Sequence, residues 1–239
     1  MNLLILKPEQ LVSDNRAVIT GRQLDHILQV HRLAPGDKLK TGLLNGQLGT
    51  GQVLSLTNVQ AEISLELNTP PPAPVDITVV LALPRPKVLR RILQDVTILG
   101  IKQLYLINSY RVEKSYWQTP VLQPENVEQQ FILGLEQSVD TRLPTLHIAK
   151  RFKPFTEDVL PGLVEGRQAL FAHPYTDTPC PLGNARKQAR LIVIGPEGGF
   201  IPYEVEKLQS AGCQPVSLGP RILKVGQAIN YMVGRLAEQ

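Results

Sequence analysis

Four prolines within five positions divide this 239-residue sequence into two parts of different character. The segment 67–74 reads LNTPPPAP, and proline both fixes φ and removes the backbone donor that helices and sheets use. We therefore expect a stiff, extended connection at this point. The predicted domains are residues 1–69 and residues 75–239, a division that a chain of this length can support.

Before the prolines, glycine and proline recur at turn positions between short apolar runs such as 52–56 and 61–65. This pattern is typical of short strands joined by tight turns. It predicts a small β-barrel that carries one helix, roughly over residues 21–32.

After the prolines, apolar runs alternate with segments of helical periodicity, which predicts an α/β domain. A mostly parallel sheet with helices on both faces follows from such alternation. The expected strands are 77–83, 103–107, 145–149, 169–172, 191–194 and 215–218. The expected helices are 88–99, 127–139, 202–212 and 226–236.

The two cysteines, Cys180 and Cys213, are too few for a disulfide framework and favour the reducing cytoplasm. The apolar opening at residues 1–6 lacks the basic start of a signal peptide, and no stretch is long enough to span a membrane. No metal is expected, because the histidines lack ligand spacing. They are His26, His31, His147 and His173.

The most informative stretch is 191–200, LIVIGPEGGF, where an apolar strand runs into a glycine-rich turn before the helix from Pro202. In open α/β sheets ligands bind beyond the carboxyl ends of the strands, and glycines let the backbone approach a ligand closely. An ordinary strand-to-helix turn is the alternative. The pattern matches neither the dinucleotide fingerprint nor the phosphate loop.

A second turn, 217–224, follows the next strand and reads SLGPRILK. We expect the two turns side by side at one sheet edge. Leu218, Ile222 and Leu223 would then supply apolar walls for a flat adenine. The alternative is that Ile222 and Leu223 merely cap the core.

The basic charge of the chain is local. The formal net charge is +4 and the pI about 9.1, yet residues 84–117 carry seven basic and two acidic side chains. Lys87, Arg90 and Arg91 share one helix face near Arg85, which favours RNA binding over the alternative of a solvated flank. Aromatic rings at 110, 116 and 117 lie near further basic residues and suit stacking on unpaired bases.

The pair GPEGGF (195–200) and LGPRIL (218–223), one helix and one strand apart, resembles the RsmE family of 16S ribosomal RNA uracil-N3 methyltransferases, of the SPOUT class. Similar fragments cover nearly the whole chain, including 25–33 with 35–37, 136–138 with 142–144, and His173-Pro174. The resemblance implies a trefoil-knotted SPOUT domain over 75–239 and a PUA-like RNA-binding β-barrel over 1–69.

The resemblance also implies S-adenosylmethionine as cofactor, ribosomal RNA of the small subunit as partner, and a homodimer without membrane attachment. The apolar spacing of Ala228, Met232 and Leu236 fits a dimer seam and fits core packing equally well. RNA contacts are expected from Arg22, Arg32, Arg85, Lys87, Arg90 and Arg91.

For the reaction, Arg221 and Lys224 are the candidates to stabilise a uracil anion, or alternatively to bind a phosphate. Glu197 would orient the donor or accept a proton, or else cap the following helix. The expected cofactor contacts are Leu170, Ala172, His173, Ile194, Gly195, Pro196, Glu197, Gly198, Gly199, Leu218, Gly219, Ile222 and Leu223.

Three segments depart from the family pattern. Residues 224–228 read KVGQA where the family has Arg-Thr-Glu-Thr-Ala, residues 95–101 read DVTILGI in place of Lys-x-x-Glu-Leu-Gly-Val, and Asp140 stands where an arginine is usual. Two alternatives follow: a non-catalytic RNA-binding or assembly paralogue, and a SPOUT methyltransferase acting on another RNA.

Overall fold

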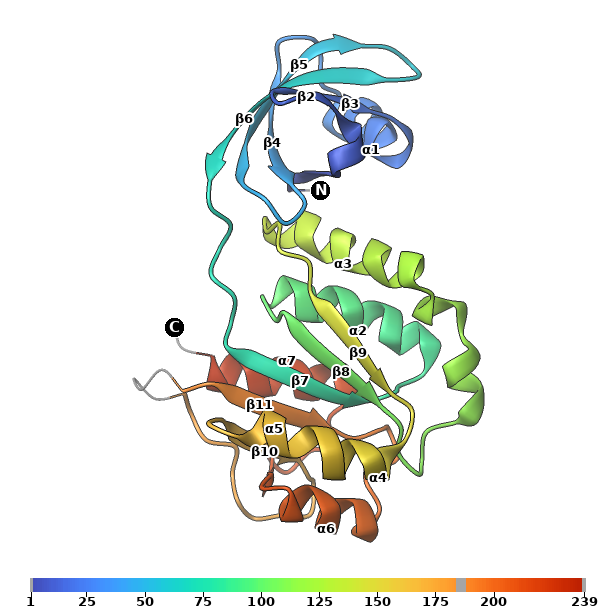
Figure 1. Cartoon of the computed structure of the whole chain (residues 1–239), viewed down its shortest axis with the longest axis vertical. Coiled ribbons are helices and arrows are strands. Elements are labelled where there is room, and N and C mark those ends of the chain that lie inside the picture. The colour runs from blue at the N-terminus through green and yellow to red at the C-terminus, as the bar shows by residue number, and fades with distance from the viewer. Residues whose placement is uncertain (1, 184–187, 238–239) are drawn as a thin grey trace. The chain divides into compact units, whose positions relative to one another are not determined.

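The computed structural model describes residues 2–183 and 188–237, so the predicted domain ends at Met1 and at 238–239 lie outside the described residues. The chain forms two compact units (Figure 1). The first comprises the residues up to Ala73 together with Phe131–Leu143, and the second comprises Pro74–Gln130 and the residues from Pro144 onward.

The first unit is built on a six-stranded sheet whose order is β1-β4-β5-β6-β3-β2. β1 and β4 are parallel and the other neighbours are antiparallel. Within the described residues no pairing joins the edge strands β1 and β2, so the sheet forms part of a barrel. The strands are β1 Leu4–Leu6, β2 Leu11–Ser13, β3 Arg16–Ile19, β4 Lys38–Leu43, β5 Leu48–Leu56 and β6 Ala61–Thr69.

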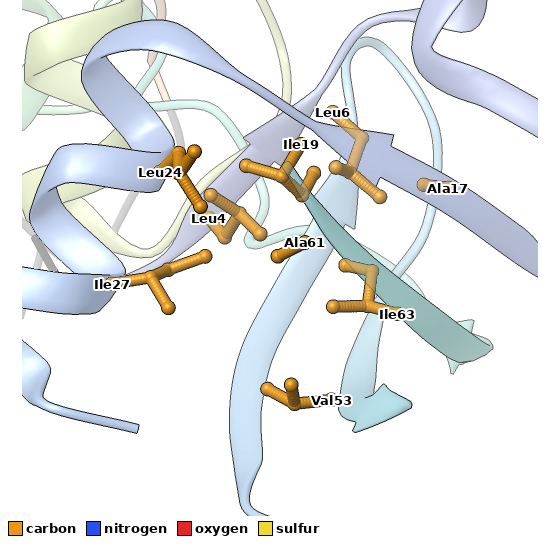
Figure 2. Close-up of a cluster of buried hydrophobic side chains, with 9 residues drawn as sticks. All are labelled: Leu4, Leu6, Ala17, Ile19, Leu24, Ile27, Val53, Ala61 and Ile63. Carbon is orange, nitrogen blue, oxygen red and sulfur yellow. The ribbon is translucent and has the colours of Figure 1, made fainter. Parts of the chain in front are cut away.

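The predicted helix over 21–32 is confirmed as α1 (Gly21–His26), which continues as a π-helical turn (Ile27–His31). It ends at Arg32, whose φ of 51° is left-handed. Leu24 and Ile27 of this helix meet strand residues in a buried apolar cluster (Figure 2). Its members are Leu4, Leu6, Ala17, Ile19, Leu24, Ile27, Val53, Ala61 and Ile63.

The second half of helix α3 (Pro124–Ser138) belongs to the first unit, although it lies far from that unit's strands in the sequence. Ile132 and Leu135 pack in a second buried cluster with Leu3 and Ile5. Glu136, which directly follows Leu135, has a side chain that is only 3% exposed, and Arg22 on α1 donates to it at 2.6 Å.

The second unit is a six-stranded sheet in which every pair of neighbours is parallel, as predicted (Figure 1). Its order is β12-β10-β11-β7-β8-β9. The predicted strands are confirmed to within two residues at each end. They are β7 Ile77–Ala82, β8 Gln103–Ile107, β9 Thr145–Ala149, β10 Gln168–Ala172, β11 Arg190–Ile194 and β12 Gln214–Val216.

Helices cover both faces of this sheet, with α4 and α5 on one face and α2 and α7, which contact each other, on the other (Figure 1). The helices are α2 Pro86–Ile98, α6 Pro202–Ser210, α7 Val225–Leu236, and the short α4 Phe152–Pro154 and α5 Leu160–Val164 joined by a π-helical turn. Two 3-10 segments, Lys114–Gln118 and Pro120–Leu122, follow β8. The sequence reasoning missed α4 and α5, since their length and proline content conceal a helical period.

The apolar stripe of α7 lies inside its own unit. Ala228, Met232 and Leu236 are at most 6% exposed, and α7 packs against α2 and β11. Of the two readings of this stripe, core packing therefore accounts for it. None of the described helices combines the length and the apolar character needed to cross a membrane.

Replacing Arg22 with alanine should lower the free energy of unfolding by about 1–3 kcal/mol, because a buried carboxylate loses its charged partner. Arg16→Ala is the matched control: its ion pair with Glu62 at 3.1 Å is solvent-exposed, and such pairs contribute about 0–1 kcal/mol. Denaturant unfolding of the full chain measures both. Equal losses in the two variants would contradict a stabilising role for the Arg22–Glu136 pair.

Candidate functional site

Three strand ends of the second unit converge on one cavity. The glycine turn at 195–199 follows β11 and the turn at 217–224 follows β12, while β10 lies between these two strands. Because all the strands are parallel, both turns lie at the carboxyl edge, and they face each other across the end of β10. They enclose a cavity of about 860 Å³.

The structure brings the predicted cofactor residues together with one exception. Leu170 is buried in β10 and is not among the residues that line the cavity. All three predicted catalytic residues, Arg221, Lys224 and Glu197, line it. The other predicted residues on its wall are Ala172, His173, Ile194, Gly195, Pro196, Gly198, Gly199, Leu218, Gly219, Ile222 and Leu223.

The glycines of the first turn are required by close packing and by backbone conformation. A Cβ on Gly195 would lie 3.2 Å from the ring of Phe200, and one on Gly198 would lie 2.9 Å from Cδ of Arg111. Gly199 has a φ of +72°, which side chains rarely adopt. Gly195 and Gly198 are therefore required by close packing against Phe200 and Arg111, whereas an added Cβ at Gly199 would meet nothing within 4 Å.

Two residues that the sequence reasoning did not assign to the site fix this turn and the helix start that follows it. Arg111, in the loop after β8, donates from Nη1 to the carbonyl of Gly198 and lines the cavity. Glu204 on α6 is 2% exposed and accepts from Tyr110 N at 2.7 Å and from Ile201 N at 3.0 Å. A glutamate three residues after a helix start is a recognisable capping signal in sequence, whereas the Arg111 contact is not.

Glu197 does not cap the helix that follows it, because Glu204 does so. Instead Oε1 of Glu197 accepts from the backbone N of Arg85 at 3.3 Å, at the start of α2. A carboxylate at a helix N-terminus is stabilised by the backbone donors there. The glycine turn is thus tied to α2 through one oxygen of Glu197.

The second turn exposes an apolar wall. Ile222 is 75% exposed, so the alternative that it caps the core is wrong. Gly219 has a φ of +105°, which suits glycine alone. Gln227, one of the departures from the family pattern, accepts from Lys224 N at 3.2 Å and so caps the start of α7.

His173, which directly follows β10, lines the cavity and has a lowered pKa. Its ring stacks on Phe171 with 5.9 Å between centroids and meets Tyr175 edge-on at the same separation. Burial lowers the pKa of this imidazole below its ordinary value of 6.5, because the charged form loses hydration. His173 is therefore neutral at pH 7.

The predicted RNA contacts fall on both units. Arg85, Lys87, Arg90 and Arg91 are exposed at the start of α2, and Arg32 is exposed at the end of the α1 segment. Arg22 is also exposed, but it binds Glu136 and so has a structural partner. Burial raises the pKa of Asp95, one turn beyond Arg91, and Arg91 partly offsets this shift.

Comparison with known proteins matches residues 71–237 to the family described as RNA methyltransferase domain. "Ribosomal RNA small subunit methyltransferase E" of Treponema pallidum is 28% identical over 95% of this chain and 87% of its own length. The protein of the same name from Bacillus subtilis is 24% identical over 92% and 89%.

Two solved structures share the fold. A ribosomal RNA small subunit methyltransferase E from Neisseria gonorrhoeae, bound to S-adenosyl methionine, has a TM-score of 0.73 and 21% identity, covering 97% of this chain and 95% of that one. A probable rRNA-methyltransferase from Porphyromonas gingivalis has a TM-score of 0.72 and 22% identity over 98% and 95%.

Replacing Glu204 with alanine should leave two backbone donors without their partner and lower the free energy of unfolding by about 1–3 kcal/mol. Glu206→Ala, on the exposed face of the same helix, is the control and should change it by no more than about 0.5 kcal/mol. Thermal unfolding of both variants tests this. A Glu204→Ala chain as stable as the control would show that the carboxylate does not anchor the loop.

Proposed function

The chain belongs to the RNA methyltransferase domain family, and from that premise we propose that it transfers a methyl group from S-adenosylmethionine to ring nitrogen 3 of a uridine in 16S ribosomal RNA. Its resemblance to the RsmE family is confirmed by relatives that match almost their whole length. The observation that carries the proposal is the cavity at the carboxyl edge, where the two family motifs meet.

The residues of the cavity fit S-adenosylmethionine. Bare backbone at Gly199, beside which an added Cβ would meet nothing within 4 Å, allows the close approach that an adenine edge needs, and Leu218 with Leu223 supplies apolar walls. The carboxylates of Glu197 and Glu206 on the cavity wall, and a neutral His173, suit a cationic ligand. When bound, this cofactor supplies a methyl group on a positively charged sulfur.

The protein's own groups would then manage the proton and the charge of the uracil ring. Nitrogen 3 carries a proton at neutral pH, and the anion left by its removal needs fixed positive charge nearby. Arg221 and Lys224 line the cavity and would supply it, with arginine the better match to a planar edge. Glu197 keeps one carboxylate oxygen for the proton or the donor, since the other accepts from Arg85.

The remaining features of the proposal concern fold and setting. We propose that the first unit is a PUA-like RNA-binding module and that the second is a SPOUT domain closed by a trefoil knot. Support for the SPOUT domain comes from the likeness in fold to the Neisseria gonorrhoeae methyltransferase E. Within this domain α7 contacts the segment after β10: Gly183 N donates to Arg235 O at 2.6 Å, and Arg235 Nε donates to Cys180 O at 3.1 Å.

The enzyme would act as a homodimer in the cytoplasm, with the small ribosomal subunit or its RNA as partner. Arg85, Lys87, Arg90 and Arg91 would bind phosphates, as would Arg32, while Arg22 serves RNA only alongside its ion pair.

A second candidate function is a non-catalytic RNA-binding or assembly factor. The observation that favours it is the segment Val225-Gly226-Gln227, which lacks the hydroxyls and carboxylate of the family pattern, and whose Gln227 caps a helix. A methyltransferase acting on another RNA is the third candidate.

Transfer of labelled methyl groups separates the three. The purified protein is incubated with labelled S-adenosylmethionine and either small subunits or naked RNA, and modified nucleosides are mapped by mass. We expect one N3-methyluridine in 16S ribosomal RNA, absent from RNA of a deletion strain. RNA binding without transfer would establish the assembly factor, and label in transfer RNA would establish the third candidate.

Gly198→Val should weaken S-adenosylmethionine binding at least about tenfold, because the new side chain displaces Arg111 and fills the turn. Gly162→Val is the control: a Cβ at this position in α5 meets nothing within 4 Å. Calorimetry measures both affinities. Wild-type affinity in Gly198→Val would remove the glycine turn from the cofactor site.

Cofactor affinity should fall as the pH drops below 6.5, because His173 then gains a proton and places a positive charge beside a cationic ligand. Since the pKa is lowered in the folded chain, affinity should stay constant above 6.5. His173→Asn should remove the acid-side loss. Calorimetry at several pH values tests this, and the same decline in both proteins would exclude His173 as its source.

A further inference from the structure

We propose that single-stranded RNA next to the target nucleotide binds across the loop after β9, on Lys150, Arg151 and Lys153. This inference rests on the proposed function and names a surface for its substrate. Residues 150–153 carry three basic side chains and no acidic one, and all three are exposed. Basic side chains at a surface usually just face water, so the case for RNA binding depends on where this loop lies relative to the cavity.

The loop after β9 is joined to the cavity by aromatic packing. Phe152 stands between Arg151 and Lys153, and its ring lies 6.3 Å from that of Phe200, centroid to centroid. Phe200 closes the glycine turn and lines the cavity. A polynucleotide with one base in the cavity therefore meets Arg151 and Lys153 within the next few nucleotides.

The loop after β8 extends the same surface. Asn108 N donates to Ala149 O at 3.1 Å, and the Nζ of Lys150 lies 6.0 Å from the ring centroid of Trp117. Arg111, in this loop, reaches the cavity at Gly198. Two loops that follow neighbouring parallel strands thus present cations and an indole along one edge.

The positive charge of the loops after β8 and β9 is only partly neutralised by acidic neighbours. Glu157 is paired with Lys207 at 2.9 Å, and its pKa is lowered by that hydrogen bond and by the nearby charges of Lys153 and Lys207. Glu113 and Asp158 are exposed on the flanking segments. The cations of the two loops are Arg111, Lys114, Lys150, Arg151 and Lys153, all exposed.

This combination suits unpaired RNA better than a protein partner. Phosphates are bound by flexible cations at the surface, and unstacked bases are bound by aromatic faces. Tyr110 is 78% exposed and follows Ser109 in the β8 loop, so it adds a second ring to the one at Trp117. An apolar protein interface would need a larger patch free of charge than this edge offers.

The test compares a triple variant, Lys150→Gln, Arg151→Gln and Lys153→Gln, with the wild type in binding a short fluorescein-labelled oligouridylate at several salt concentrations. We expect RNA affinity to fall about tenfold, and the slope of log affinity against log salt to become shallower by about 2, since each phosphate contact on a single strand contributes about 0.7. The control is Lys102→Gln with Arg167→Gln at the opposite edge of the sheet, where affinity and slope should not change.

Trp117 gives a readout confined to this surface, because it is the only tryptophan in the chain. The fluorescence of Trp117 should change as RNA is added. The midpoint of this change should fall at the same RNA concentration as the midpoint of the fluorescein-anisotropy titration, and the triple variant should lose the change. An unchanged affinity and salt slope in the triple variant, or a Trp117 signal indifferent to RNA, would overturn the inference.

Cofactor affinity, measured by calorimetry on the same proteins, separates this inference from the proposed function. It should be equal in the wild type and the triple variant. A wild type that binds neither RNA nor S-adenosylmethionine would reject the proposed function itself. A wild type that binds both, with a triple variant that matches it, would reject only the β9 loop as an RNA surface.

Discussion

The parallel pairing of β10, β11 and β12 is the constraint on which the site depends. A parallel sheet sends every strand toward the same edge, so turns separated by a helix in the sequence come to lie around one space. β10 separates β11 from β12, and its end supplies the floor on which His173 lies, between the two glycine turns. An antiparallel neighbour would have sent one turn to the far edge.

Hydrogen bonds from backbone N–H groups to two glutamate side chains then fix the loops around that space. Glu204 holds the loop after β8 to the start of α6, and Glu197 holds the glycine turn to the start of α2. These carboxylates satisfy backbone donors that a helix start or a loop would otherwise leave without a partner. Arg111, in the loop after β8, adds a third contact by donating to the carbonyl of Gly198.

Two of the departures from the family pattern, at Gln227 and Asp140, form local hydrogen bonds. Gln227 stands where the family has a threonine, and it caps α7 through Lys224 N. Asp140, in place of the usual arginine, is buried and accepts from Arg142 N at 3.0 Å, which shapes the turn after α3. Both substitutions are thus accommodated by local hydrogen bonds, and the cavity keeps Arg221 and Lys224 on its wall.

The sequence by itself determined the strands of the second unit and the two glycine turns, because apolar runs and glycines report local conformation and burial directly. Only the tertiary structure assigned residues 131–143 to the first unit, excluded Leu170 from the cavity and placed Arg111 at Gly198. Those three facts depend on contacts between residues far apart in the chain, and local periodicity carries no information about which distant partner a side chain meets.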